Sequence, residues 1–327
     1  MNQNTLHVVV MGVGDIGSRH LQSLAKSAQP LSIYAVDPSE DAANVAKQRF
    51  CEIEGYELHE YHQLRVAEAL PSQVDLAIIA TTAKHRAQAV KQLLSQSNVA
   101  YMILEKILFV DDSDYEHIGS LLRDKQVKCW VNHPRRCFPF YQALKQRINA
   151  SSKVSMIIHG GGWGLGSNGL HFVDLLSYFV GQTNIAFNTC SLDKALYDYK
   201  RVGYKEIYGV FTAEIGQHRL VMHCENYTSP WAISIETDTL SLRIDEESET
   251  FIEMEKQKGW KAEFSHPKMT DYQSNMTHQI MQDLMQNGTC DLTSFDDAVA
   301  LHQPFVHAMK RFFTEECGLD QSAFPIT

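Results

Sequence analysis

The 327-residue sequence has no excess of positive charge and no long apolar run, and each absence excludes a class of protein. Lysine and arginine number 29 against 39 aspartates and glutamates, so the chain lacks the basic surface that binding to a duplex requires. No run of about 18 apolar residues offers a membrane-spanning helix. We therefore expect neither nucleic acid nor a membrane among its partners.

The sequence also lacks motifs of metal, redox and hydrolase sites. Its seven cysteines are odd in number and widely spread, and none forms a C-x-x-C pair, which suits a reducing compartment. The N-terminus shows no basic leader with an apolar stretch and a cleavage site, so we expect a cytoplasmic protein. Neither H-E-x-x-H nor a G-x-S-x-G elbow occurs, and we expect no metal site.

What the sequence does contain is a globular composition, 44% hydrophobic, over a length that predicts two domains. In residues 1–134, apolar runs of strand length alternate with segments of helical period. Parallel strands need long crossovers that cover the sheet, so this pattern predicts an α/β, doubly wound Rossmann domain. The expected strands are 6–11, 31–36, 74–80, 100–104 and 127–131, and the expected helices are 16–27, 41–50, 83–95 and 114–124.

Residues 135–327 follow a different pattern and are predicted to form a C-terminal α+β domain. Extended runs joined by short turns, such as Gly216-Gln217, favour an open, mainly antiparallel sheet. Two late helices could pack back on either domain. The expected helices are 140–148, 170–179, 272–286 and 296–313, and the expected strands are 154–159, 207–215, 218–226, 232–237, 240–244 and 250–255.

A G-x-G-x-x-G fingerprint directly follows the first predicted strand and opens a helix. Gly12 permits the tight turn, Gly14 lets the backbone approach a pyrophosphate, and Gly17 lets the helix pack closely on the strand. Asp37 ends the next strand, about 20 residues after Gly17, where a carboxylate meets the adenosine ribose. This carboxylate would repel a 2′-phosphate, so we expect NAD as the cofactor, in preference to NADP.

Asp15 and Ile16 fill the variable positions of the fingerprint, and we include both among the cofactor-binding candidates. Asp15 can help cap the helix, but its charge would lie near the pyrophosphate, so we expect its side chain to point outward. The alternative is a glycine turn that merely joins a strand to a helix. The joint occurrence of the fingerprint and the ribose acid disfavours that alternative.

Four further motifs follow in order, namely ATTAKH at 80–85, EKIL at 105–108, VNHPRR at 131–136 and a glycine-rich segment at 160–181. Together with the fingerprint they resemble the glucose-fructose oxidoreductase, inositol dehydrogenase and MocA (Gfo/Idh/MocA) family, clearly over about residues 6–181. The resemblance implies an NAD(P)-binding Rossmann domain and a second domain that carries the substrate and often an oligomer contact. It adds Thr81, Thr82, His85 and Glu105 to the cofactor-binding candidates.

The resemblance also implies two catalytic residues, Lys106 and His171. The family's Glu-Lys-Pro motif places a lysine between nicotinamide and substrate, and here Ile107 replaces the proline. Its Asp-x-x-x-His pattern matches His171, whereas Ser167 stands at the position of the aspartate. That departure removes a carboxylate that would handle a proton.

The chemistry of these residues agrees with such roles. Lys106 follows a predicted strand at the carboxyl edge of the sheet, where open α/β folds bind ligands, and we predict it to be the general acid/base. An ordinary surface lysine is the alternative. Asp174 lies one turn from His171 and could fix the imidazole tautomer, so that the ring donates to or relays a proton from the substrate. Otherwise His171 would be a structural residue.

Several residues of the second half are candidate substrate contacts. Trp163 could stack on a sugar face or bury itself against a helix. Arg136 could bind a carboxylate or phosphate, or form a salt bridge. The glycines before His171 suggest either close backbone approach to a ligand or a mobile cover. The candidate set is Arg136, Trp163, Ser167, Asn168 and Asp174, where Asn168 could substitute for the missing carboxylate.

These observations predict an NAD-dependent oxidoreductase that acts on a secondary alcohol or carbonyl of a sugar, polyol or nucleotide-sugar-like substrate. One alternative is a redox-neutral enzyme with retained NAD, which hydrolyses or epimerises through a transient keto intermediate, as the altered position of Ser167 suggests. Another is a non-catalytic NAD-binding regulator. The resemblance also implies a homo-oligomer.

Overall fold

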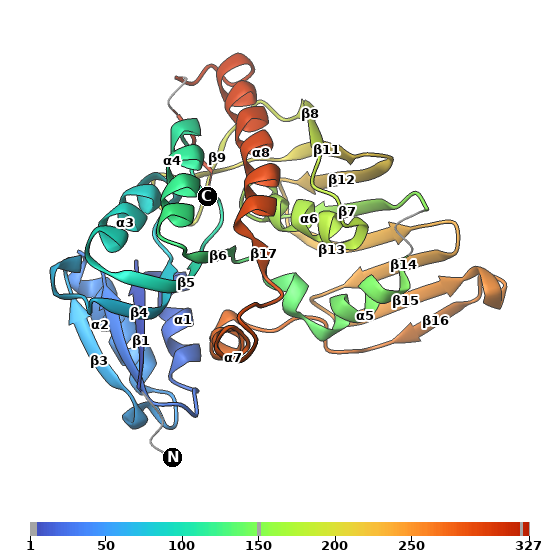
Figure 1. The fold of residues 1–327 in the computed structure, drawn as a ribbon. Coiled ribbons are helices and arrows are strands. Elements are labelled where there is room, and N and C mark those ends of the chain that lie inside the picture. Colours follow the sequence, from blue (N-terminus) through green and yellow to red (C-terminus); the bar gives the residue numbers. More distant parts are fainter. Residues whose placement is uncertain (1–4, 149–151, 321–322, 327) are drawn as a thin grey trace. The chain divides into compact units, whose positions relative to one another are not determined.

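The computed structural model describes residues 5–148, 152–320 and 323–326 (Figure 1). The chain divides into two compact units of similar size. The first unit consists of Met1–Pro134 together with Asp271–Asp296, and the second of Arg135–Thr270 together with Asp297–Thr327. A late segment of the chain therefore completes the N-terminal unit.

The first unit is built on a seven-stranded sheet in the order β17-β6-β5-β4-β1-β2-β3, in which only the pairing of β17 with β6 is antiparallel. Strands β1, β2, β4 and β5 of this sheet are mostly apolar and largely buried, which suits a sheet covered by helices on each side. The strands are β1 (Leu6–Met11), β2 (Leu31–Val36), β3 (Glu60–Leu64), β4 (Gln73–Ile79), β5 (Asn98–Leu104), β6 (Lys128–Val131) and β17 (Thr293–Ser294).

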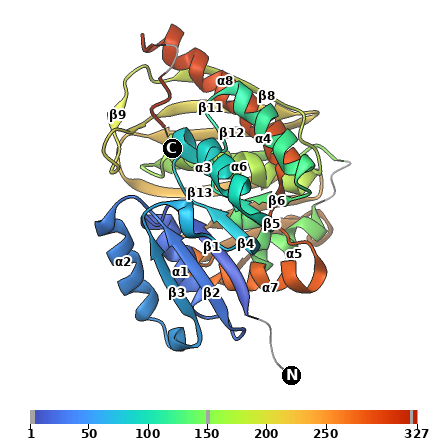
Figure 2. The ribbon, with the colours of Figure 1, turned by 60° about the vertical axis from the view of Figure 1, so that its left-hand side comes forward.

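The strand order of this sheet reverses direction between β1 and β4. Right-handed crossovers on either side of such a reversal place their helices on opposite faces. Accordingly α1 packs with α2 and α7, and α3 packs with α4 (Figure 2). The helices are α1 (Asp15–Leu24), α2 (Glu40–Cys51), α3 (Ala83–Gln96), α4 (Asp112–Asp124) and α7 (Thr277–Asn287), with 3-10 turns at Tyr56–Leu58, Ala67–Ala69, Pro134–Cys137 and Gln273–Asn275.

One strand of this sheet, β3, is not predictable from the pattern of apolar residues. It pairs in parallel with β2 at the end of the sheet, and its residues Glu60 and Gln63 are exposed. An end strand needs to bury little of its surface, so its sequence carries no apolar run. The two-residue strand β17 also has no counterpart among the predicted strands, and α7 begins five residues after its predicted start. The other strands and helices of this unit match the predicted ones to within three residues at each end.

The second unit contains an eight-stranded sheet in the order β16-β15-β14-β13-β7-β12-β11-β8. Its neighbours are antiparallel except for β7 and β12, so the prediction of a Rossmann domain followed by a mainly antiparallel α+β domain is confirmed. The strands are β7 (Ser155–Gly161), β8 (Ile185–Leu192), β11 (Gly209–Ile215), β12 (His218–Glu225), β13 (Ser229–Glu236), β14 (Leu240–Asp245), β15 (Thr250–Glu255) and β16 (Ala262–Ser265), and β9 (Tyr197–Asp198) pairs with β10 (Lys205–Glu206).

The helices of the second unit are α5 (Pro139–Arg147), α6 (Leu165–Val180) and most of α8 (Phe295–Glu315), with a 3-10 turn at Lys256–Lys258. Helix α6 begins five residues before the predicted start, so it runs through Gly166 and Gly169. Glycine disfavours helix, but thirteen of the sixteen residues of α6 are buried, and this packing overrides the local preference. His171 therefore lies in the second turn of α6.

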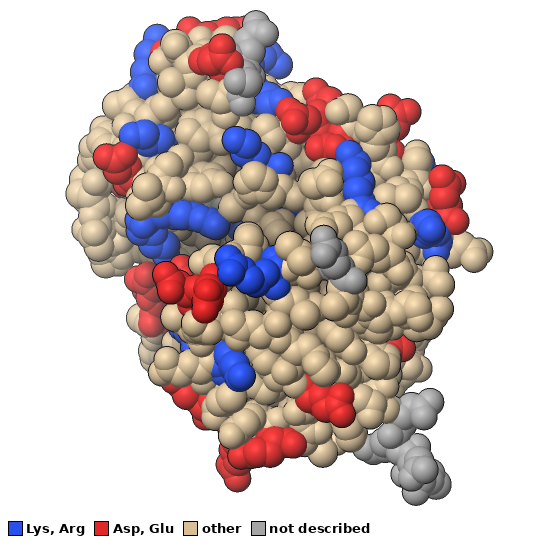
Figure 3. Space-filling view, turned by 90° about the vertical axis from the view of Figure 1, so that its left-hand side faces the viewer, with Lys and Arg blue, Asp and Glu red and all other residues tan. Residues whose placement is uncertain are grey.

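None of the helices in the described part of the chain has the length and apolar character needed to cross a bilayer. On the face of the molecule drawn in Figure 3, lysine and arginine side chains are interspersed with aspartate and glutamate.

Candidate functional site

The three glycines of the fingerprint lie in the turn from β1 to α1, and they differ in what a side chain would meet. A Cβ on Gly12, whose φ is +83°, would lie 2.7 Å from the backbone nitrogen of Thr81. A Cβ on Gly17 would lie 1.9 Å from the carbonyl oxygen of Gly12. At Gly14 nothing lies within 4 Å of the same position. Gly12 and Gly17 are thus required by packing, whereas Gly14 faces open space.

Asp37 lies where the sequence analysis expects the ribose acid, after β2. Its Oδ2 accepts a hydrogen bond of 2.8 Å from the Val13 amide, and its Oδ1 accepts one of 2.9 Å from the Ser39 amide. The carboxylate is thereby held against the fingerprint turn. The side chain of Asp15 is fully exposed, with its Oδ1 3.8 Å from Arg49 Nη1, and Ile16 is 47% exposed. Asp15 therefore points away from the turn.

The segment after β4 carries Thr81 and Thr82, and Thr82 is the N-cap of α3 with His85 exposed in its first turn. The hydroxyl oxygen of Thr81 is buried and has no hydrogen-bond partner among the described residues. This buried polar atom is a second feature that suits a bound polar group near the turn. Thr81 also lies against Gly12, as the distance above shows.

Lys106 follows β5 at the same carboxyl edge of the sheet, and its side chain is partly exposed. The peptide bond between Lys106 and Ile107 is cis. Arg86, only 1% exposed on α3, donates hydrogen bonds to the carbonyl oxygens of Thr81, Ile107 and Leu108. Arg86 thus joins the Thr81 segment to the segment that carries Lys106. Sequence analysis missed it, because an arginine on an amphipathic helix looks like a solvated residue.

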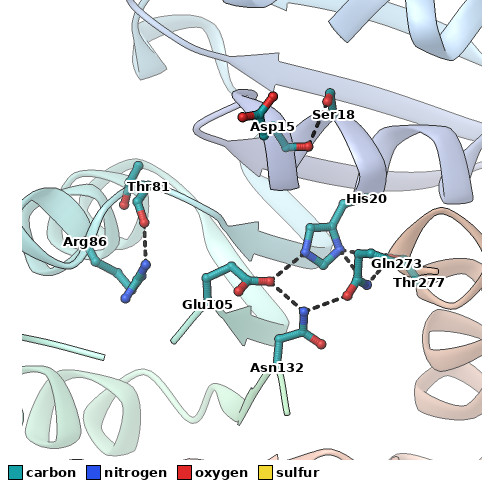
Figure 4. A network of polar contacts seen from close by, with 9 residues as sticks. All are labelled: Asp15, Ser18, His20, Thr81, Arg86, Glu105, Asn132, Gln273 and Thr277. Carbon is teal, nitrogen blue, oxygen red and sulfur yellow. Dashed lines mark hydrogen bonds and ion pairs between the residues drawn. The ribbon is translucent and has the colours of Figure 1, made fainter. Parts of the chain in front are cut away.

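The carboxylate of Glu105 belongs to a buried polar network within the first unit (Figure 4). Its Oε1 accepts hydrogen bonds from His20 Nε2 at 3.0 Å and from Asn132 Nδ2 at 2.6 Å. The other ring nitrogen of His20 lies 2.8 Å from Thr277 Oγ1, and Gln273 bonds to both Asn132 and Thr277. Helix α1, strand β5 and the segment before α7 are therefore joined beside Lys106.

The same network keeps Glu105 ionised. Burial alone would raise the pKa of this carboxyl, but the hydrogen bond and charge of His20, with Asn132 and Arg86, outweigh burial and lower the pKa. An ionised carboxylate buried in this way is a strong hydrogen-bond acceptor. The structure thus gives Glu105 partners inside the first unit, and the contact with the cofactor that the resemblance implies stays a prediction.

This lowered pKa predicts an acid-sensitive first unit. The folded pKa lies below the ordinary value of 4.5, so the stabilisation is complete above that pH and is lost as the pH falls through the folded pKa. Glu105→Gln should therefore unfold about 1–3 kcal/mol more easily at pH 7, and this deficit should shrink below pH 4.5. Urea unfolding at pH 7, 5 and 3.5 measures it, with exposed Glu57→Gln as control. A deficit independent of pH would contradict the assignment.

In the second unit, α6 places Ser167, Asn168 and His171 close together in the chain. His171 is partly exposed and Ser167 is buried. Asn168 Nδ2 donates a 2.6 Å hydrogen bond to the carbonyl of Trp163. Trp163 is 8% exposed; its Nε1 donates to the His223 carbonyl at 3.0 Å and its ring packs edge-to-face with Phe172. Trp163 is therefore buried against α6, which is one of the two alternatives expected for it; the other was stacking on a sugar face.

The two arginines that follow His133 each face a carboxylate. Arg136 forms a bidentate pair with the buried Asp174, Nε to Oδ2 at 2.8 Å and Nη2 to Oδ1 at 2.7 Å. Arg135 pairs in the same way with Glu246, at 2.8 and 2.6 Å. Of the alternatives given for Arg136, the structure thus shows the salt bridge. Within the described residues, no three His, Cys, Asp or Glu side chains converge as a metal site would require.

Residues 6–133 match the model of an oxidoreductase family, GFO_IDH_MocA, described as an NAD-binding Rossmann fold. The match spans the fingerprint, Asp37 and Lys106, and it confirms the resemblance inferred from these motifs. A search of curated protein sequences finds no match.

Solved structures with the same fold cover nearly the whole chain. An oxidoreductase from Agrobacterium radiobacter in complex with NAD+, L-tartaric acid and magnesium has a TM-score of 0.70 and 15% identity, covering 97% of this chain and 99% of its own. A UDP-N-acetylglucosamine 3-dehydrogenase from Acidithiobacillus ferrooxidans has a TM-score of 0.69 and 13% identity, with coverages of 93% and 97%. The transcriptional regulator Gal80p from Kluyveromyces lactis has a TM-score of 0.69 and 17% identity, with coverages of 100% and 96%.

Proposed function

We propose that this chain, whose residues 6–133 match the Gfo/Idh/MocA oxidoreductase family model, is an NAD-dependent oxidoreductase. The observation that carries the proposal is the turn after β1, where Gly14 faces open space at the N-terminus of α1 and Asp37 is held beside it. Backbone amides and the helix dipole at such a terminus favour a pyrophosphate. Asp37 is placed to accept hydrogen bonds from the ribose, which favours NAD over NADP.

When bound, NAD would accept or donate the hydride at the reacting carbon. The chain itself supplies the groups that handle the proton. Lys106, at the carboxyl edge of the sheet, would take the hydroxyl proton as general base in one direction and return it in the other. His171 would hydrogen-bond the substrate oxygen as a second proton-handling group. Arg86 would hold the Lys106 segment through the carbonyl groups of Ile107 and Leu108.

We propose a secondary alcohol or carbonyl of a sugar, polyol or nucleotide-sugar-like molecule as the substrate. Two observations support this class, namely the family match and the structural similarity to a UDP-N-acetylglucosamine 3-dehydrogenase. We also propose that the protein is a cytoplasmic homo-oligomer. The seven cysteines, none of them in a disulfide, agree with a reducing compartment.

Titration calorimetry with cofactor-stripped protein tests the proposed cofactor. NAD should bind, and NADP should bind at least about tenfold more weakly, since one repulsive contact of 1.4 kcal/mol has that effect. Asp37→Asn keeps the acceptor for the Val13 amide but loses the charge, so it should narrow the difference between the two cofactors. Asp41→Asn, an exposed acid on α2, is the matched control and should bind as the wild type does. Absence of heat with either cofactor would refute the proposal.

A second candidate function is a non-catalytic NAD-binding regulator. Two observations favour it: Ile107 and Ser167 depart from the motifs of the family, and Gal80p, a transcriptional regulator, shares the fold. A regulator of this kind would bind NAD yet show no turnover with any sugar or polyol. Multiple-turnover chemistry with NAD would exclude it.

A further inference from the structure

A buried carboxylate from another part of the chain contacts the first turn of α6, at Ser167, which is four residues before His171. It belongs to Glu206 of β10, which is 4% exposed. Its Oε1 accepts hydrogen bonds from the amides of Gly166 at 2.5 Å and Ile207 at 3.0 Å. Its Oε2 accepts a 2.9 Å hydrogen bond from the hydroxyl of Ser167. Glu206 therefore reaches the very residue at which the family pattern has an aspartate.

The glycines around this turn make room for that carboxylate. A Cβ on Gly166 would lie 2.7 Å from Glu206 Oε1. A Cβ on Gly164 would lie 2.4 Å from Ser167 Oγ and 3.2 Å from Glu206 Oε2. Both positions must remain free of side chains for Glu206 to approach the helix. From the sequence, these glycines suggest close approach of a ligand or a mobile cover. In the structure, the carboxylate of Glu206 lies beside Gly164 and Gly166.

Ser167 bonds to this carboxylate and lies one helical turn before His171 on α6. Residues four apart in a helix lie on the same face, so Ser167 and His171 are neighbours on α6. The Ser167 hydroxyl donates to Glu206, with the Gly164 carbonyl a more distant acceptor at 3.4 Å. Because the Ser167 hydroxyl donates its proton to Glu206, its oxygen can act as an acceptor for a donor on the helix face that it shares with His171. An imidazole N–H is such a donor, and accepting from it would select one tautomer of His171.

We propose that Glu206 is a positioning residue for His171, and that it supplies through Ser167 the negative charge that residue 167 itself lacks. The proposal rests on the proposed function, in which His171 hydrogen-bonds the substrate oxygen. The charge sits at the N-terminus of α6, where the helix dipole favours an anion. Glu206 itself exchanges no proton in this role.

A charge exchange between positions 206 and 167 tests the proposal. Glu206→Gln should lower kcat about tenfold, as loss of an orienting partner typically does, and should leave the KM for NAD unchanged. Ser167→Asp should lower both kcat and the thermal midpoint, because it sets two carboxylates against each other. The double variant S167D/E206Q should recover kcat to within about threefold of wild type, since one carboxylate is again present in the cluster.

Imidazole ¹⁵N chemical shifts, recorded on the full chain without substrate, give a readout that does not depend on turnover. The His171 resonances should shift in Glu206→Gln and return toward wild type in the double variant. Glu236→Gln, an exposed acid on β13, should change neither the shifts nor kcat. The proposal would be overturned if the loss of kcat in the double variant equalled the product of the losses in the two single variants. It would also be overturned if the His171 chemical shifts were the same in Glu206→Gln as in the wild type. If no substrate is found, the proposed function fails, while the shifts still decide whether Glu206 controls His171.

Discussion

Replacing Lys106 with methionine is expected to lower kcat by roughly 10²- to 10⁴-fold, the contribution of a positioned acid or base. Methionine keeps the apolar stem and removes the ammonium group, so the segment anchored by Arg86 should retain its fold. NAD affinity should stay within about twofold of wild type, because the cofactor would be held mainly by the fingerprint turn and Asp37. The expected signature is thus intact binding with lost turnover.

The measurement is NADH absorbance with a panel of polyols, sugars and UDP-linked sugars, combined with NAD calorimetry. Lys125→Met, at the exposed end of α4, is the control for a lost surface charge. Undiminished turnover in Lys106→Met would remove Lys106 from its proposed role. Product formed without net NADH would instead favour the redox-neutral reaction with retained NAD.

Alanine substitutions at Gly17 and Gly14, in the turn after β1, are expected to have large but different effects, the first on stability and the second on NAD binding. Gly17→Ala would place a methyl carbon 1.9 Å from the Gly12 carbonyl oxygen, which neither backbone segment can accommodate without moving. Overpacking of this kind costs about 3 kcal/mol or more, which lowers the thermal midpoint by roughly 6–12 °C. Gly14→Ala has φ near -63° and open space around the new carbon, so its fold should be unaffected.

Gly14→Ala should nevertheless weaken NAD binding by at least about tenfold, because the methyl group occupies the space assigned to the pyrophosphate. Thermal unfolding and NAD calorimetry on the two variants separate the roles, since one loses stability and the other loses binding. Wild-type NAD affinity in Gly14→Ala would show that the open space beside this glycine is not where the cofactor lies.

Much of the first unit could be predicted from short stretches of sequence. Strands such as β1 and β2 are mostly apolar because they are largely buried on both faces, and their neighbours in the chain are helices of clear period. The fingerprint and Asp37 are also local, since a tight turn and a strand end restrict which residues can stand there. Strand β3 escaped prediction because an end strand needs no apolar run.

The partners of the candidate site residues were beyond the reach of sequence reasoning. Glu105 bonds to His20, which lies 85 residues before it in the chain. His20 in turn contacts Thr277, which lies 257 residues after His20. Arg86 is buried and donates to the carbonyl oxygens of Ile107 and Leu108, which lie about 20 residues later in the chain. The periodicity of a helix does not predict that an arginine on it is buried. Glu206 reaches Ser167 from a two-residue strand that carries no apolar pattern at all.

Sequence reasoning alone was enough to predict the Rossmann sheet, the dinucleotide turn and the resemblance that the family match over residues 6–133 confirms, because each depends on residues close together in the chain. The fold was needed to show which carboxylates have partners, why side chains do not fit at Gly164 and Gly166, and that Glu206 bonds to Ser167. The physical reason is that a hydrogen bond or a charge pair depends on distance in space, and folding brings together residues whose separation in sequence carries no signal.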